Sequence, residues 1–111
     1  MKKVEVKQIT DSIINERNNI KINRQKLLQL NFNINVKGFE YWTYGLCIYE
    51  PNMKLLNFYH TIANKFEISE DNVEKSMRLC SQRAIPYIRK KYHYLGRITT
   101  RTILELITME E

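Results

Sequence analysis

The chain has 111 residues, of which 43% are hydrophobic, and it carries a formal net charge of +6. This length fits one domain, and this share of apolar residues excludes a chain that is disordered throughout. No apolar stretch is long enough for a membrane span or an export signal, so we expect a cytoplasmic protein with reduced cysteines.

The N-terminal third is predicted to form an extension followed by the start of a domain. A helical pattern begins near Thr10 or Asp11, but several asparagines interrupt it, and we predict a break between Lys21 and Asn23. Residues 1–23 are therefore treated as a partly helical extension, and 24–111 as the domain. The segment 31–35 alternates polar and apolar residues; we expect a turn there, because a lone five-residue strand is marginal.

Three further helices are predicted before residue 86. One runs from about Gly38 to Ile48 and ends before Pro51, since proline disfavours helical geometry in the residue that precedes it. Between Met53 and Phe66, apolar residues recur at spacings of three and four, as in an amphipathic helix. Ser69 is a suitable N-cap for a new helix, which would begin only three or four residues after the previous helix ends. Two helices joined by so short a turn predict a helix-turn-helix.

The helix after Ser69 is expected to have two distinct faces. At 100° per residue, one compact stripe contains Val73, Met77, Cys80 and Ala84, which we predict to be buried. The opposite face carries Asp71, Lys75, Arg78 and Gln82, flanked by Asn72, Glu74 and Leu79.

The C-terminal part is predicted to contain one more helix. Pro86 is expected to end or kink the preceding helix. A short final helix, capped by Thr99 or Thr100, should bury Ile103, Leu104 and Ile107. The sequence thus predicts an all-α fold, a compact helical bundle that contains a helix-turn-helix.

Charge is distributed unevenly along this region. From Lys75 to Arg101 there are eight positively charged residues and no acidic residue, whereas four acids cluster between Glu67 and Glu74. A contiguous basic region is the electrostatic pattern expected of a protein that binds nucleic acid.

Three stretches resemble segments of the C-terminal effector domain of the stage 0 sporulation protein A family, response regulators that initiate sporulation in bacteria. Residues 30–41 are similar to that family's IGVPAHIKGYLY segment, residues 62–66 to its IAKKF, and residues 73–78 to the VERAIR of its recognition helix. The resemblance covers roughly residues 24–108. It implies an all-helical, winged-helix-like domain whose helix-turn-helix binds short, often tandem, promoter elements.

The resemblance also implies which residues face DNA. Glu74 and Arg78 retain the family's residues, whereas Lys75 and Asn72 stand where the family has arginine, and Leu79 where it has histidine. Lysine lacks the planar fork with which arginine reads guanine, so the target element should differ from the family's. No phosphoacceptor receiver domain is recognisable in this chain, so we expect no direct control by aspartate phosphorylation within it.

The predicted DNA-binding residues fall into two groups. Side chains of the recognition helix should face the bases, and basic residues after it should bind backbone phosphates, together with the N-terminus of the first helix of the motif. The first group is Asp71, Asn72, Glu74, Lys75, Arg78, Leu79 and Gln82, and the second is Arg89, Lys90, Lys91 and Arg97. The aromatic residues Tyr41, Trp42, Phe58 and Phe66 are expected in the core.

Catalytic and metal chemistry find no support in the sequence. It contains no glycine-rich phosphate loop, no paired catalytic carboxylates and no nucleophile elbow, so we expect no enzyme activity and no cofactor. The order Cys47, His60, Cys80, His93 lacks the close ligand pairs typical of zinc sites. We also place Cys80 on the buried face, where a thiol is unreactive.

Three functions fit these features. The first is a bacterial transcriptional regulator that binds double-stranded DNA, as a monomer or as a homodimer on tandem or palindromic sites, and that contacts RNA polymerase. The second is a DNA-binding accessory factor of a plasmid or phage, active in replication, partition or transfer. The third is a protein-interaction module that antagonises a full-length relative by pairing with it.

Overall fold

The fold is built from helices alone in residues 17–110, the part of the chain that the computed structural model describes. A first helix occupies residues 17–29 of this range. It is followed by α2 (Gly38–Ile48), α3 (Leu55–Phe66), α4 (Glu70–Ser81), a 3-10 turn (Gln82–Ala84), α5 (Ile85–Tyr92) and α6 (Thr100–Thr108). The predicted all-α class is confirmed, and no strand interrupts the connection at 31–35.

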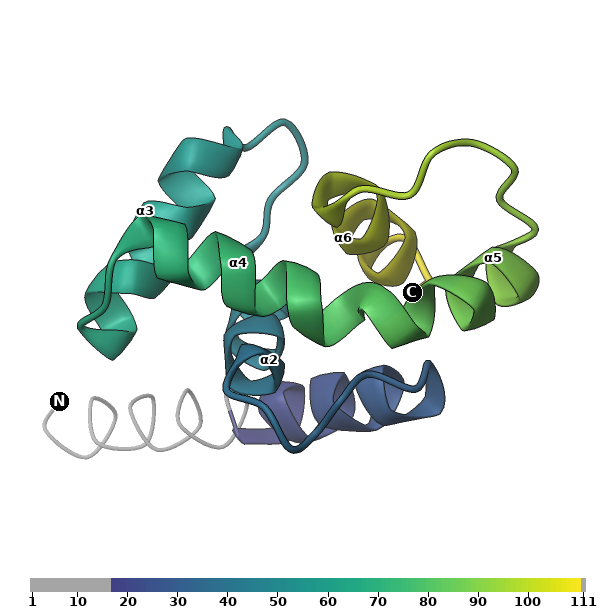
Figure 1. Cartoon of the computed structure of the whole chain (residues 1–111), viewed down its shortest axis with the longest axis horizontal. Helices are drawn as coiled ribbons and strands as arrows, with labels where there is room; N and C mark the ends of the chain where they lie inside the picture. The colour runs from purple at the N-terminus through teal and green to yellow at the C-terminus, as the bar shows by residue number, and fades with distance from the viewer. Residues whose placement is uncertain (1–16, 111) are drawn as a thin grey trace, which may run out of the picture.

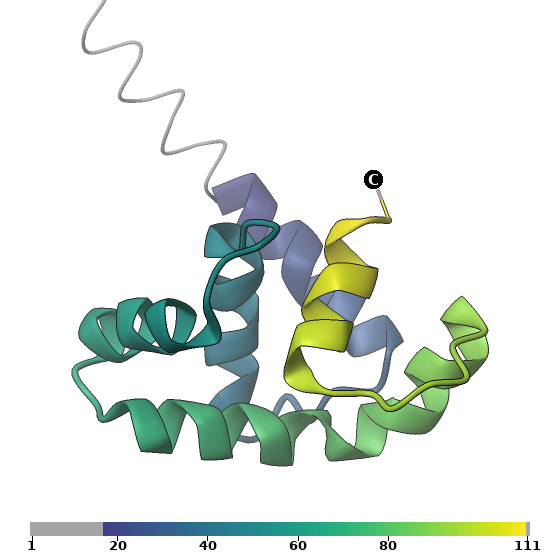
Figure 2. The same cartoon turned by 90° about the horizontal axis from the view of Figure 1, so that it is seen from above.

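Helix α2 occupies the centre of the molecule. It runs nearly perpendicular to α4, with α3 on one side of it and the first helix and α6 on the other (Figures 1 and 2). Helix α4 lies along one edge of this arrangement, so that one of its sides is covered by α2 and the other is open (Figure 2). The fold therefore exposes a whole helix face while it buries the face behind.

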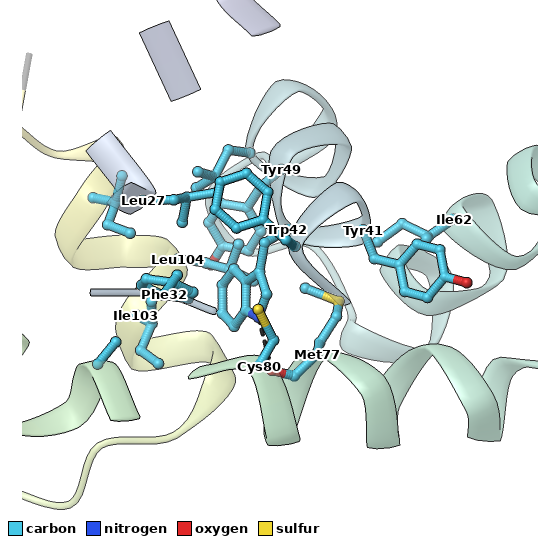
Figure 3. Packing of buried hydrophobic residues seen from close by; sticks show 14 of the residues in the cluster. Leu27, Phe32, Tyr41, Trp42, Tyr49, Ile62, Met77, Cys80, Ile103 and Leu104 are labelled. Carbon is cyan, nitrogen blue, oxygen red and sulfur yellow. Dashed lines mark hydrogen bonds between the residues drawn. The ribbon is translucent and has the colours of Figure 1, made fainter. Parts of the chain in front are cut away.

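The core forms around Trp42 of α2, whose side chain is fully buried. Its indole ring packs edge-on against Phe32, with the ring centroids 5.2 Å apart. Leu27, Met77 and Leu104 bring the first helix, α4 and α6 into the same cluster (Figure 3). Tyr41 and Phe58 are also buried and Phe66 packs against the cluster, as predicted for the aromatic residues.

The first helix departs from the sequence prediction. It continues without a break through Lys21–Asn23, so the predicted boundary between residues 23 and 24 falls within a helix. The reason is tertiary: Leu27 and Leu30 are buried, and the Asn23 side chain donates a hydrogen bond to the Thr43 carbonyl at 3.3 Å. These contacts outweigh the weak helix propensity of asparagine. The predicted helix start near Thr10 or Asp11 lies outside the described residues.

The predicted helix ends are partly confirmed. Thr99 caps α6 by accepting a hydrogen bond from the Thr102 amide, and Ile103, Leu104 and Ile107 are buried as expected. Pro86, however, does not end or kink α4, which finishes five residues earlier at Ser81. Proline instead stands in the first turn of α5, where its missing amide proton leaves no helical hydrogen bond unmade.

No strand occurs in the described residues, so a wing built from a β-hairpin is not part of the described fold. A loop of residues 93–99 connects α5 and α6 instead. None of the described helices combines the length and hydrophobicity that crossing a membrane requires.

Candidate nucleic-acid interface

The connection between α3 and α4 consists of only Glu67, Ile68 and Ser69. Glu67 adopts the left-handed conformation (φ 57°, ψ 45°), and the Ile68 amide donates to the Ala63 carbonyl at 3.1 Å, which closes the end of α3. The Ser69 hydroxyl then accepts a hydrogen bond from the Asn72 amide at 3.2 Å and starts α4, as the sequence predicted. Every step of this turn is thus fixed by a backbone or capping hydrogen bond.

Helix α2 packs against the buried face of α4 at very close range. A Cβ atom added to Gly38 would lie 2.2 Å from the Ser76 carbonyl oxygen, so only glycine permits this approach. One turn further along α2, the Trp42 indole Nε1 donates to the Met77 carbonyl at 2.8 Å (Figure 3). These two contacts fix the rotation of α4 about its own axis, and hence which side chains it exposes.

The predicted inner stripe is buried: Val73, Met77 and Cys80 of α4 and Ala84 of the 3-10 turn have no exposed surface. The predicted outward residues gather on the open side. Asp71, Asn72, Lys75, Arg78, Leu79 and Gln82 are exposed, and Glu74 is partly exposed. The structure therefore brings the seven predicted base-reading residues together on one side, six of them on α4 and Gln82 at the start of the 3-10 turn that follows it.

Arg78 and Glu74 form an ion pair on this face. The Nε of Arg78 donates to Oε1 of Glu74 at 3.1 Å, one helical turn away. This contact leaves the two terminal nitrogens of the guanidinium group to donate elsewhere, in the fork geometry that suits guanine or a phosphate. Glu74 thereby orients Arg78.

A groove of about 390 Å³ runs beside this face. One wall is formed by α4, with Glu74, Arg78 and Gln82. The opposite wall is formed by the residues that lead into α6, from Arg97 to Thr100, and Leu55 and Tyr59 from the start of α3 also line the groove. Arg97, predicted as a phosphate ligand, thus lies across a groove from Arg78.

The other predicted basic residues lie on α5 and have mixed surroundings. The Arg89 guanidinium donates to the carbonyls of Tyr94 and Gly96, at 3.0 and 3.1 Å, and so holds the following loop. Lys91 pairs with Glu110 at 2.7 Å, which neutralises its charge. Lys90 is exposed. Lys90 and Arg97 are therefore better placed than Arg89 and Lys91 to bind a phosphate.

The electrostatic field changes sign along α4. Its first turn carries Glu70 and Asp71, where the positive end of the helix dipole favours acids, and Glu70 contacts His60 Nδ1 at 2.6 Å. Its last turn carries Arg78 and leads toward Arg83. A polyanion should therefore approach the C-terminal half of α4 and the neighbouring loop more closely than the N-terminal turn.

Sequence reasoning missed several residues that shape this surface. Arg83 donates to the side chain of Asn31 at 3.1 Å, and Arg101 to the Met53 carbonyl at 2.9 Å. Both arginines thus fasten neighbouring loops to the helical frame. Leu95, in the 93–99 loop, is almost fully exposed. No local pattern marks these positions, since their roles depend on segments that meet only in the folded chain.

Neither cysteine belongs to a metal site within residues 17–110, where no group of three or more potential ligands occurs. Cys47 is exposed and Cys80 is buried. Burial raises the pKa of the Cys80 thiol to about 11, so it stays protonated at neutral pH. The buried position predicted for Cys80 is thus confirmed.

Comparison of the chain with protein-family models, with curated proteins and with solved structures finds no match.

Proposed function

We propose that this chain binds double-stranded DNA sequence-specifically and acts as a bacterial transcriptional regulator, with α3 and α4 as a helix-turn-helix. The observation that carries the proposal is the open face of α4. It presents Lys75 and Arg78, with Gln82 at the same spacing just beyond its end, while its opposite face is fully buried against α2. A helix exposed along one side and rigidly held on the other is what insertion into a groove requires.

The dimensions of α4 suit the major groove. Its 12 residues span about 18 Å at 1.5 Å per residue, and the major groove of B-DNA admits a helix. Lys75, Arg78 and Gln82 recur every three or four residues and therefore lie along one line of the helix surface. In the proposed docking, this line faces the base edges.

Phosphate contacts in this docking come from the elements beside α4 and beyond its C-terminal end. Arg97 and Lys90 supply positive charge beyond its C-terminal half, and the N-terminus of α3, which has no acid in its first turn, supplies a partial positive charge. The acids at the start of α4 should keep that end farther from the backbone. Such contacts position the protein, whereas base contacts determine the sequence it prefers.

A link to sporulation control rests on the resemblance to the stage 0 sporulation protein A family alone. Within that proposal, Arg78 and Glu74 act as a pair that reads a guanine. The rest of the target element then differs from the family's element because of Lys75, Asn72 and Leu79.

The deciding experiment is selection of random duplex DNA by the purified chain at near-physiological salt, because affinity for a basic protein depends strongly on salt. We expect one enriched motif. Weak binding without enrichment would refute sequence-specific reading and favour the protein-interaction module, which a stable complex with a full-length relative would then support. Sites clustered at one replication or transfer origin, rather than at promoters, would favour the accessory factor.

Arg78→Ala tests the docking itself. We expect a loss of about 1–3 kcal/mol in binding free energy and relaxed preference at one base position of the motif. Arg17→Ala is the matched control, because it removes the same charge from the first helix, whose N-terminal end lies far from α4 (Figure 2). Equal losses for the two variants would show that Arg78 contributes only general charge, and would contradict the docking.

A further inference from the structure

The most exposed large apolar side chain in residues 17–110 is Leu95, with 92% of its surface accessible. It stands in the loop between α5 and α6, between Tyr94 and Gly96. A single exposed leucine on a mobile loop would mean little, because folded proteins expose many apolar atoms. The surroundings of Leu95 are different, since the backbone on both sides of it is held in place.

Arg89 holds this loop. Its Nη1 donates to the carbonyl of Tyr94 at 3.0 Å and to that of Gly96 at 3.1 Å, on either side of Leu95. The Tyr94 amide donates to the Arg89 carbonyl at 3.3 Å, and the Tyr94 ring lies against Gly96. The loop thus presents Leu95 to solvent from an ordered backbone.

The loop lies beside the open face of α4. Arg97 and Ile98, just after Leu95, line the same groove as Arg78 and Gln82. The figures agree with this position: the loop runs alongside α5 and the turn that follows α4, and it comes close to the C-terminal end of α4 where it enters α6 (Figures 1 and 2). A duplex held against α4 would therefore also meet this loop.

The charge around Leu95 indicates which kind of surface this side chain would contact. Arg97 follows it by two residues and Lys90 precedes it on α5, and both side chains are exposed. The acid Glu110, which lies against α5, is paired with Lys91. A basic surface with one projecting leucine is suited to the minor groove, where architectural proteins insert apolar side chains between base pairs while arginine and lysine bind the narrow, negative groove.

We propose that the loop of residues 94–97 enters the minor groove next to the major-groove site of α4, with Leu95 as a wedge between two base pairs. Arg97 binds the adjoining backbone or groove floor and holds the wedge in place. The inserted side chain partly unstacks one base step and bends the duplex. This inference rests on the proposed function, because it requires that α4 bind duplex DNA.

The test uses the whole chain and a duplex carrying the motif selected as described above, with 2-aminopurine at steps flanking it and a fluorophore at each end. We expect the wild-type chain to increase 2-aminopurine emission at one flanking step and to shorten the end-to-end distance. Leu95→Ala should abolish the emission change, reduce the bend and weaken binding roughly tenfold, with the preferred motif unchanged. Met109→Ala is the control, as a side chain 80% exposed near the C-terminus that should change nothing.

The possible results separate the two proposals. If the wild-type chain binds the motif without unstacking or bending the duplex, the wedge is refuted and the major-groove docking stands. A Leu95→Ala variant that binds and bends DNA like the wild type would also refute the wedge and leave the major-groove docking standing, provided that its thermal unfolding shows an intact fold. If no motif is selected at all, both proposals fail, and the exposed Leu95 becomes evidence for a protein partner.

Discussion

The close approach of α2 to α4 predicts that Gly38→Ala destabilises the fold. An alanine Cβ at this position would lie 2.2 Å from the Ser76 carbonyl oxygen and 2.8 Å from Cys80 Cβ, whereas ordinary contacts begin near 3.4 Å. The nearest atom belongs to the backbone of a helix and cannot rotate aside. Helix α2 must therefore move away from α4 by roughly 1 Å.

The size of the effect follows from what this movement disturbs. Overpacking in a core costs about 1–3 kcal/mol. The separation also stretches the hydrogen bond from Trp42 to the Met77 carbonyl, now 2.8 Å, whose loss costs about 0.5–1.5 kcal/mol. The higher helix propensity of alanine offsets at most about 1 kcal/mol of this loss in stability. We expect a net loss of about 2–3 kcal/mol, which corresponds to a fall in Tm on the order of 10 °C.

Urea unfolding monitored by circular dichroism and by the fluorescence of the one tryptophan, Trp42, measures this loss. Gly96→Ala is the control, because the atoms nearest to its added Cβ belong to the Tyr94 ring, 3.1 Å away, and a ring can shift. The sign of the change in unfolding free energy for Gly38→Ala decides whether α2 and α4 are in such close contact. A variant as stable as the wild type, or more stable, would show that α2 and α4 do not meet as closely as described.

Four further predictions concern the helix caps, the core and the thiols. Ser69→Ala and Thr99→Ala should each cost about 1 kcal/mol in urea unfolding, and their effects should add, because each hydroxyl caps a different helix; no loss would contradict the capping hydrogen bonds. Trp42→Phe should cost about 2–4 kcal/mol, through a cavity and one lost hydrogen bond, and unfolding by circular dichroism would reveal a smaller change if the indole were not buried. Iodoacetamide at pH 8 should modify Cys47 quickly and Cys80 only on unfolding, as mass spectrometry can show, and fast labelling of both would disprove the burial of Cys80. Because burial raises the pKa of Cys80 from 9.0 to about 11, its contribution to stability should be intact below pH 9 and decline as the pH rises through 11, which unfolding of a Cys80→Ala variant over the same range controls.

Much of the fold could be predicted because it depends on local chemistry. Ser69 and Thr99 cap helices through amides only three residues away, and the apolar spacing of α4 specifies which of its faces is buried. The ion pair between Glu74 and Arg78 is local in the same sense, since it joins residues one helical turn apart. Such interactions form whatever the rest of the chain does, so they can be recognised in the sequence.

The errors in prediction have two different sources. Asn23 remains in a continuous helix because the distant helix α2 offers it the Thr43 carbonyl. The error at Pro86 is local: α4 already ends at Ser81 and a 3-10 turn follows, so the proline falls in the first turn of α5. Propensity describes an isolated segment, and tertiary contacts worth a few kcal/mol override it.

The sequence by itself determined that the chain is helical, that α4 has a polar and an apolar face, and that positive charge follows it. Only the tertiary structure decided how these charges are used: Arg89 holds a loop, Lys91 neutralises Glu110, and Arg97 lies across a groove from Arg78. The physical reason is that helix formation and capping act over three or four residues. The position of a charge relative to another surface depends instead on contacts between residues that are 5 to 19 positions apart in these examples.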